Sequence, residues 1–591
     1  MTLRCLLSIL LFAFVAGMSG CIGGPTFRTT TTPPTPTITS VSPTRVTAGG
    51  AGFTLTVNGS NFNSGADLVW RNPDNPEFIG GQVTVVNSSQ VTLQIPAGAI
   101  AVPGSAQVFI FNPNSPNSNT VTFPINPGPP GGAQAISVGA NSAPPNGNSH
   151  DPVLSFNGRF VAFASEATNL ITPSANFSEG YMRDTCLSAI GPPTCIPSTL
   201  LVSAINGGTA GSPVEGNGQG GATPSFGSQS FSPPSSGIPP AGRFVGFLST
   251  ATNLVTPNTT SQQAYVRDNC FASFIVPSCT PATALASVTQ TGGEPNGSAS
   301  ALSFANNTCH VAFVSAGTDL VSGVTIPNEI YLTSCSANGV SGGFTTTTLV
   351  SASSSGVSGD QGAQQPAISS DGRFVAFAST STNLTSTPKG GVQQIYLRDT
   401  CTSAPTGCAP ATTIVSVDSS GSALAGSSSL PAISDDGRFI VFSTQVAIPT
   451  GGGTSIVSVH DACNSSTGPA AACTPSTTAV SIGAGGAAAN GPSSSTPHAV
   501  SGDGRFVVFS SSATNLIAGG NPAAQVFVRD TCNSSSGPVA GCTPRTVLVS
   551  MGNAGPTGGF DAAISDDGHF VAFVNETLGS VQQVLVAATG F

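Results

Sequence analysis

Short runs of alternating apolar and polar residues cover most of the chain, and Gly, Pro, Asn and Asp separate them. The run Val91–Ile95 has the two-residue period of a β-strand, and Ala106–Phe111 and Phe374–Phe377 are short apolar runs rich in Val, Ile and Phe. The segment Leu6–Ala16 is a longer apolar stretch, but it is too short to span a bilayer stably. The pattern therefore predicts an all-β protein, and a length of 591 residues predicts at least two domains.

Residues 37–126 are predicted to form a small β-sandwich, because alternating strands lie between turn signals throughout the segment. The opening Ile38–Pro43, the stretch Ala48–Phe62 and the late Val108–Pro113 resemble the IPT/TIG immunoglobulin-like family, and the resemblance covers nearly the whole segment. Such domains serve as spacers or binding modules, which is what the resemblance implies. Trp70, the single tryptophan, is expected in the core of this domain.

The remainder of the chain, residues 135–591, repeats one motif of the form Pro-x-x-Ser-x-Asp-Gly-Arg-Phe-Val-x-Phe. Consecutive copies lie 64 to 67 residues apart, except for a first interval of 84 that contains a Pro-rich insertion at 232–240. Seven copies indicate seven units. Their last phenylalanines are Phe163, Phe247, Phe313, Phe377, Phe442, Phe509 and Phe573.

Each unit reads as four strands, and the fourth unit shows them at 366–369, 373–377, 394–398 and 412–416. The seventh unit shows only three, whereas 135–138, just after a linker at 127–134, copies the fourth-strand pattern of 413–417. We therefore expect this early strand to complete the last unit and close a seven-bladed β-propeller, which leaves no sheet edge exposed. A β-solenoid is the alternative, but it leaves the early strand unexplained.

The hairpin motif resembles the TolB-like, WD40-like propeller repeat over about residues 135–591. That resemblance implies the fold but no single activity, since propellers host lyases, peptidase gates and adaptors.

The N-terminus resembles a bacterial lipoprotein signal. Arg4 supplies a positive charge, Leu6–Ala16 the apolar stretch, and small residues precede Cys21, so residues 1–20 are expected to be removed and Cys21 to carry lipid. Ile22 follows the cysteine, and the Asp that marks inner-membrane retention is absent. We expect an outer-membrane anchor in the cell envelope, with the Thr/Pro-rich 21–36 as a spacer. An ordinary secretory signal is the alternative.

Twelve cysteines fall within the repeats, and an even number in an exported chain favours disulfides over metal ligation. Ten of them bracket the loop between the third and fourth strands of one unit. These pairs are Cys186/Cys195, Cys270/Cys279, Cys401/Cys408, Cys463/Cys473 and Cys532/Cys542. The third unit has Cys309 and Cys335 instead, at or beside the positions that carry Arg and Asp elsewhere.

Five units keep both an Arg after Asp-Gly or its equivalent and an Asp at the end of the third strand, and two units lack both. This joint presence predicts cross-strand ion pairs. The pairs are Arg159/Asp184, Arg243/Asp268, Arg373/Asp399, Arg438/Asp461 and Arg505/Asp530. The most regular charges are therefore assigned to the fold, and the Cys309/Cys335 pair is expected to replace one such ion pair.

Little in the sequence indicates catalysis. Of the five histidines, His150 and His498 are the two expected near a channel-facing first strand, and neither has a clear partner. No serine elbow, metal motif or cofactor motif is found, and the segments that carry calcium in related repeats lack clustered carboxylates. A formal charge of −10 without a basic patch excludes nucleic acid as an expected partner.

The sequence therefore favours a non-catalytic envelope lipoprotein, expected as a monomer, that binds a protein, peptidoglycan or glycan partner through its propeller. The alternatives are an exported, lyase-like carbohydrate-active enzyme that uses the channel, and a purely structural surface protein.

Overall fold

The structure is a computed structural model of the whole chain, and all its regular elements apart from three short 3₁₀ helices are β-strands. It describes residues 34–591 except for several short segments. These are 73–74, 81–82, 101–103, 114, 127, 129, 188–195, 207–213, 219, 228–241, 271–279, 306–307, 337–338, 388–390, 405, 448–452, 523, 553–554 and 576–580. Cys21, Cys195 and Cys279 lie outside the described residues. Across the described part of the chain, no helix is long and apolar enough to cross a membrane.

The N-terminal domain is a sandwich of two sheets. One sheet has the order β1 (Thr37–Ser42), β3 (Phe53–Ser60), β7 (Gln90–Ile95), β6 (Thr84–Asn87). The other has the order β2 (Val46–Thr47), β9 (Val121–Asn126), β8 (Gly104–Phe111), β4 (Asp67–Asn72), β5 (Asn75–Gly80). A short 3₁₀ helix, η1 (Ala97–Ile100), follows β7. Trp70 is fully buried between the sheets, 5.0 Å from the ring of Phe123, as a core residue of this domain.

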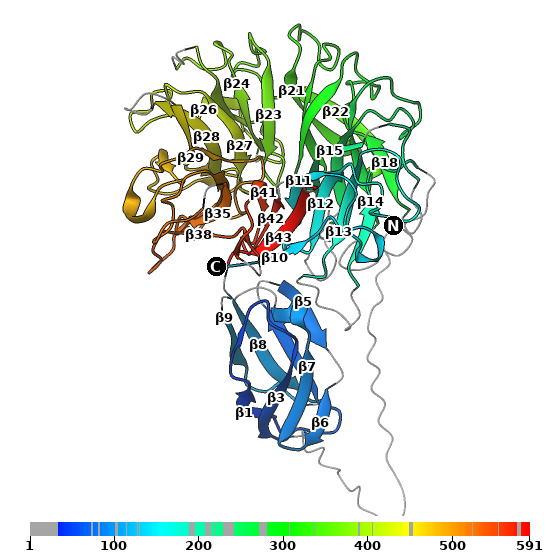
Figure 1. Ribbon diagram of the computed structural model, residues 1–591, viewed down its shortest axis with the longest axis vertical. Helices are drawn as coiled ribbons and strands as arrows, with labels where there is room; N and C mark the ends of the chain where they lie inside the picture. Colours follow the sequence, from blue (N-terminus) through cyan, green and yellow to red (C-terminus); the bar gives the residue numbers. More distant parts are fainter. Residues whose placement is uncertain are drawn as a thin grey trace, which may run out of the picture.

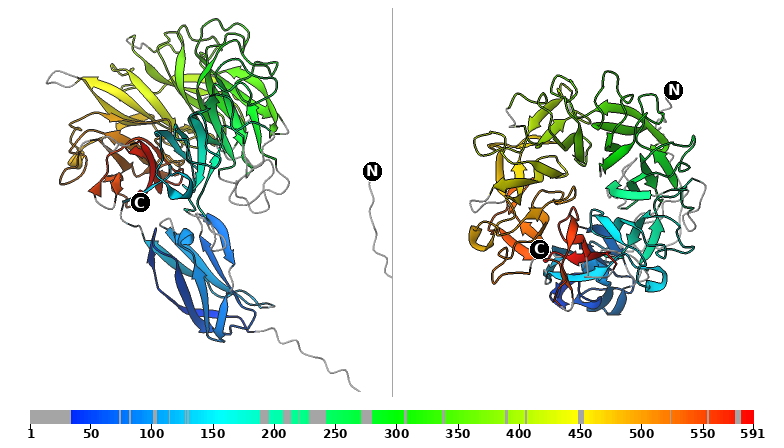
Figure 2. Two further views of the ribbon diagram at one scale, coloured as in Figure 1. Left: turned by 45° about the vertical axis from the view of Figure 1, so that its right-hand side comes forward. Right: turned by 45° about the horizontal axis from the view of Figure 1, so that its top comes forward.

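Seven further four-stranded antiparallel sheets follow within the described residues, and they are arranged around a common centre (Figure 2, right). Each corresponds to one unit of the repeat. The first three units are β11 (Ser149–Leu154), β12 (Phe160–Ser165), β13 (Glu179–Asp184), β14 (Ser198–Leu201); β15 (Gly220–Gly227), β16 (Phe244–Ser249), β17 (Gln263–Asp268), β18 (Ala282–Leu285); and β19 (Ala299–Phe304), β20 (His310–Ser315), β21 (Glu329–Ser336), β22 (Gly339–Leu349).

The next three units follow the same order. They are β23 (Ala363–Ile368), β24 (Phe374–Ser379), β25 (Gln394–Asp399), β26 (Ala411–Ile414); β27 (Ser428–Ile433), β28 (Phe439–Ala447), β29 (Gly453–Asp461), β32 (Ser476–Ala479); and β33 (Ser493–Ser494), β34 (Phe506–Ser511), β35 (Gln525–Asp530), β38 (Arg545–Leu548). Short hairpins join the third and fourth strands of units five and six. They are β30 (Asn464–Ser465) with β31 (Gly468–Pro469), and β36 (Asn533–Ser534) with β37 (Gly537–Pro538).

The seventh sheet draws its outer strand from before the first unit. It consists of β41 (Phe560–Ile564), β42 (Phe570–Asn575), β43 (Gln583–Ala588) and β10 (Gly131–Ala135), and β10 pairs antiparallel with β43. The early strand was expected at 135–138, but it begins at Gly131, inside the expected linker. Backbone bonding continues past it, since Ile136 N–H donates to Val584 O at 2.8 Å.

Two short 3₁₀ helices, η2 (Ala140–Ser142) and η3 (Ala484–Gly486), and one hairpin, β39 (Met551–Gly552) with β40 (Gly555–Pro556), complete the elements. The sandwich lies below the ring, beside β10 and β43 (Figure 1).

Adjacent sheets of the ring pack through apolar side chains of their inner strands. The core cluster between units one and two contains Val153 and Phe160 from one sheet and Phe247 and Tyr265 from the next. Within five units a phenylalanine of the second strand also lies beside an aromatic ring of the third, with centroids 5.6 to 5.9 Å apart. Because both faces of each sheet are covered in this way, the second strands are almost entirely buried. These sheets are consistent with the blades of a β-propeller.

Candidate functional site

The five arginine–aspartate pairs each lie within one sheet, at the end where the first hairpin turns. In each pair the arginine Nε and Nη2 donate to the two carboxylate oxygens, and the Nη2–Oδ2 distances are 2.7 to 2.9 Å. Each guanidinium also lies over the ring of the following phenylalanine, 4.7 to 5.0 Å from its centroid. The same charges recur from unit to unit in one structural role, so they do not mark a site.

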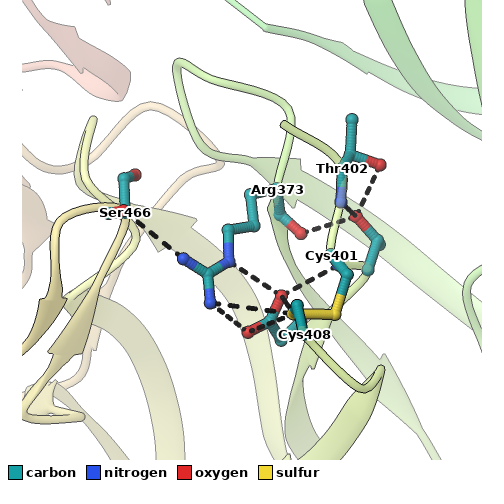
Figure 3. Close-up of a disulfide and its surroundings, with 7 residues drawn as sticks. Arg373, Cys401, Thr402, Cys408 and Ser466 are labelled. Carbon is teal, nitrogen blue, oxygen red and sulfur yellow. Dashed lines mark hydrogen bonds and ion pairs between the residues drawn. A yellow bond between two sulfur atoms is a disulfide. The ribbon is translucent and has the colours of Figure 1, made fainter. Parts of the chain in front are cut away.

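Disulfides lie beside these pairs (Figure 3). In the fourth unit Cys401 N–H donates to Asp399 Oδ1 at 2.9 Å, and Cys401 is bonded to Cys408. The bonds Cys463–Cys473 and Cys532–Cys542 occupy the same place in the next two units. Cys186 and Cys270 are also disulfide-bonded. In units four, five and six, the Asp and Cys side-chain atoms lie within 4.8 Å of one another, but the sulfurs are joined to each other and are not thiolates.

The third unit carries a disulfide where its neighbours carry an ion pair, since Cys309 and Cys335 are bonded. Cys309 directly precedes β20, as Arg373 precedes β24. Cys335 is one residue beyond the aspartate position, because Ser334 pairs with His310 as Asp399 pairs with Phe374.

His150 lies within β11, the first strand of unit one, and His498 lines the cavity at the centre of the ring. His150 Nδ1 is 3.0 Å from Asp151 Oδ2, and this hydrogen bond raises the pKa of His150. The N–H of Asp151 donates to Asp561 Oδ2 at 2.8 Å. Burial and the charge of Asp151 raise the pKa of Asp561 to about 6.

His498 was expected on a first strand, but it lies in a turn after β33, which is only two residues long. Pro497 precedes it at the position where Gln365 and Leu430 adopt a positive φ inside their strands, and proline, with φ fixed at about −65°, cannot adopt that conformation. Burial lowers the pKa of His498 to about 4, so its ring is neutral at pH 7.

The centre of the ring is narrow. First strands bring apolar side chains to it, and the cavity between them is only about 60 Å³, far below the size of a ligand pocket. The apolar residues lining it include Leu154, Phe304, Ile368, Ile433 and Ile564. A sugar ring does not fit into this part of the centre.

Asp435 and Asp566 line the end of this cavity at the first hairpins, with Gly502 between them. A Cβ on Gly502 would lie 2.3 Å from Asp435 Oδ2 and 3.2 Å from Asp566 Cβ, so only glycine leaves room for both carboxyl groups. Backbone bonds connect the three residues, since Asp435 N–H donates to Gly502 O and Gly502 N–H donates to Asp566 O. Burial and the charge of Asp435 raise the pKa of Asp566 well above its ordinary value.

A groove of about 970 Å³ opens beside this end of the cavity, between units six and seven. Six aspartates, two arginines and His569 line it. The aspartates and arginines are Asp435, Asp436, Asp503, Asp530, Asp566, Asp567, Arg505 and Arg545. Asp435, Gly502 and Asp566 line both the groove and the central cavity.

Two aromatic rings that lie between two arginines line one part of the groove. Arg505 lies 4.7 Å from the ring centroid of Phe506, Phe506 lies 5.0 Å from Phe591, and Arg545 lies 4.4 Å from Phe591. This stack therefore combines cationic groups with aromatic rings, and aspartates also line the groove.

The groove exists because of how the seventh sheet is built. In units five and six a hairpin and a disulfide loop connect the third strand to the fourth, and they cover the arginine of the preceding unit. In unit seven the fourth position is held by β10, so no such loop joins it to β43. The side chain of Arg505 is consequently 27% exposed, against 10% for Arg373 and 9% for Arg438.

Comparison with known proteins identifies the N-terminal domain and a distant likeness of the ring. Residues 36–125 are an IPT/TIG domain. The whole structure is similar to β-propeller proteins at low identity. The tricorn protease is 11% identical, with a TM-score of 0.28 over 88% of this chain and 44% of its own, so this chain spans less than half of that enzyme.

A TolB-like protein from Agrobacterium tumefaciens is 10% identical, with a TM-score of 0.22 over 57% of this chain and 85% of its own. The sialidase of Trypanosoma rangeli is 9% identical, with a TM-score of 0.32 over 77% of this chain and 59% of its own. No curated protein sequence matches the chain. Such values concern the fold, and nothing about activity follows from them.

Proposed function

We propose that the chain is an exported lipoprotein of the outer membrane, anchored through Cys21, with the IPT/TIG domain as a spacer. Residues 135–591 form a TolB-like, seven-bladed propeller closed by β10, and the protein binds an envelope partner non-catalytically as a monomer. The partner is a protein, peptidoglycan or another glycan. The observation that carries this proposal is the groove of about 970 Å³ between units six and seven.

The groove has the size and chemistry of a binding site. Its volume is at the upper end of the range for ligand pockets, and it combines aromatic rings with a few polar groups. Six aspartates against two arginines disfavour an anionic ligand, because a second negative charge would lie beside carboxylates already partly withdrawn from water. Nucleic acid is excluded from the proposal for the same reason.

A fill-in variant tests this role. Ala540 lines the groove and is exposed, so Ala540→Trp narrows the groove without entering the core. Ala471 is the equivalent exposed residue in unit five, where the neighbouring unit leaves no groove, and Ala471→Trp is the matched control. Purified full-length protein in detergent is titrated calorimetrically with muropeptides, neutral oligosaccharides and envelope-protein peptides.

We expect one ligand class to bind the wild type and Ala471→Trp with equal affinity. The same class should bind Ala540→Trp at least about tenfold more weakly, because a tenfold change in Kd corresponds to only about 1.4 kcal/mol. Equal binding to all three proteins would place the site elsewhere. If none of the three ligand classes binds the wild type, a purely structural surface protein would be favoured.

The carboxyl pair Asp435 and Asp566 favours a second candidate, a carbohydrate-active enzyme. A carboxyl group whose pKa is raised by burial and by a second carboxyl group beside it is a feature of glycosidic general acid–base chemistry. The narrow cavity restricts such a reaction to the groove side of the pair. Sugar release by the wild type that is lost in Asp566→Asn would establish this activity, and turnover unaffected by that change would refute it.

A further inference from the structure

Among the described residues, two of the five ion-paired arginines also contact the next unit, and in both the contact is to a peptide carbonyl. Arg373 Nη1 donates to Ser466 O of the next unit at 3.4 Å (Figure 3), and Arg438 Nη1 donates to Ser535 O at 3.2 Å. Ser466 and Ser535 belong to the short hairpins that connect third and fourth strands. The guanidinium therefore fixes its own aspartate with two nitrogens and a neighbouring carbonyl with the third.

The same serines make a second backbone contact. Ser466 N–H donates to Asp436 O, and Ser535 N–H donates to Asp503 O, each at 2.8 Å. One residue of the hairpin is thus held through its N–H and its C=O together. We call the arginine Nη1 and the aspartate carbonyl that hold it the backbone slot.

The last copy of the backbone slot lies in the groove. Its donor is Arg505 Nη1, for which the described residues provide no acceptor, and its carbonyl is that of Asp567, at the same motif position as Asp436 and Asp503. A carbonyl oxygen has two lone pairs, so Asp567 O can accept an N–H whatever else it contacts. In units five and six the chain fills this slot itself, whereas in unit seven β10 replaces the connection that would do so.

We infer that the groove binds a peptide segment of a partner protein, which places one residue in the backbone slot with its C=O on Arg505 and its N–H on Asp567. This inference rests on the proposed function and names its ligand class. It favours a peptide over a glycan, because the slot is already occupied twice in this protein by peptide backbone. It also favours a neutral or basic segment, because Asp436 and Asp503 line the same groove.

The chain itself supplies a probe for the experiment. A synthetic ring of residues 532–542, Cys-Asn-Ser-Ser-Ser-Gly-Pro-Val-Ala-Gly-Cys closed by its disulfide, copies the hairpin that fills the slot in unit six. Three variants of the ring are made: N-methylation at the Ser535 position, N-methylation at the Ala540 position, and Lys or Glu in place of Val539. Binding of the labelled rings to full-length protein is measured by fluorescence anisotropy.

We expect the parent ring to bind saturably and N-methylation at the Ser535 position to weaken binding at least about fivefold, because one N–H donor is lost. N-methylation at the Ala540 position leaves the affinity within about twofold, a difference small against one hydrogen bond. The Lys ring binds more tightly than the Glu ring, and added salt reduces that difference.

Protein variants separate this contact from general destabilisation. Arg505→Lys and Arg438→Lys both lose the guanidinium fork, but only Arg505 has its slot in the groove. Arg505→Lys is expected to weaken ring binding at least about fivefold and Arg438→Lys by less than twofold, because the slot of Arg438 is already filled. Equal effects of the two variants, or tighter binding of the Glu ring, would overturn the inference.

Failure of this inference is distinguishable from failure of the proposed function. If no ring binds but Ala540→Trp still abolishes binding of a ligand class found by calorimetry, the groove is a binding site without backbone capping, and a glycan is then the ligand to pursue. If neither the rings nor any ligand class depends on Ala540, both proposals fail.

Discussion

Glu179 offers a quantitative test of how its position in the repeat determines the protonation state of a buried carboxyl group. It begins the third strand of unit one, fully buried, and accepts a hydrogen bond from Ser203 Oγ. Units two, four and six have Gln263, Gln394 and Gln525 in this position, and each accepts the same bond from a serine hydroxyl at 2.5 to 2.7 Å. The environment is therefore built for a neutral group.

Burial accordingly raises the pKa of Glu179 to about 8 from an ordinary value of 4.5. Below pH 4.5 the acid is protonated in both the folded and the unfolded chain and contributes no pH dependence. Between pH 4.5 and 8 only the unfolded chain loses the proton, so stability falls as pH rises, and it levels off above 8. At about 1.4 kcal/mol per pH unit, the full loss is about 5 kcal/mol.

The Glu179→Gln variant does not lose this stability at high pH, because glutamine does not ionise. With an unfolding entropy of about 1 kcal/mol/K for a ring of roughly 450 residues, 5 kcal/mol corresponds to about 5 °C in Tm. By differential scanning calorimetry, we therefore expect the Tm of the variant to exceed that of the wild type by about 5 °C at pH 8. At pH 4.5 we expect the two Tm values to be equal.

An internal control is available because Trp70, the single tryptophan, lies in the sandwich. Its fluorescence transition should not respond to Glu179→Gln. The reciprocal change, Gln525→Glu, should introduce the same pH dependence in unit six. A variant whose Tm gain is equal at pH 4.5 and pH 8 would refute the reasoning, because the effect would then come from packing and not from ionisation.

Three further outcomes are expected. Arg438→Met should lower the free energy of unfolding by about 3–5 kcal/mol in chemical denaturation, since it strands the buried Asp461, and Asp461→Leu in the same chain should restore most of the loss; no restoration would argue against the ion-pair account. Gly502→Ala should cost about 1–3 kcal/mol, because its Cβ meets a carboxylate oxygen at 2.3 Å, and an unchanged Tm would show that the two aspartates move apart freely. Radiolabelled palmitate should label the wild type but not Cys21→Ala, and equal labelling would refute the anchor.

Much of the fold can be predicted from the sequence because its signals are local. The Asp-Gly turn, the alternating strand that follows it and the regular spacing specify the hairpin of each unit, and a copied strand pattern indicates where β10 pairs. Exact boundaries depend on longer-range bonds. Gly131 joins the sheet although it lies in a linker-like stretch, and Pro497 shortens the first strand of unit six to two residues.

The candidate site is harder to predict because it arises from closing the ring. Asp435 and Asp566 are ordinary turn residues in their own repeats, and they meet only when units five and seven are placed around Gly502. Arg505 and Arg438 occupy the same position of the repeat motif, and they differ in how far the neighbouring unit covers their side chains. The available signal was the missing fourth strand of unit seven, which predicts closure but not the groove that closure leaves. His498 adds no charge to this part of the ring at pH 7, since burial lowers its pKa to about 4.

The most direct test of the account is site-specific photocrosslinking in living cells of the native host. A benzophenone amino acid is placed at Ala540 in the groove or, as the matched control, at Ala471, in otherwise wild-type full-length protein. The account predicts one discrete envelope adduct from position 540, absent from position 471, which disappears when Arg505→Lys is added. Identical adducts from both positions, or none from either in cells that expose the protein normally, would contradict binding through the groove.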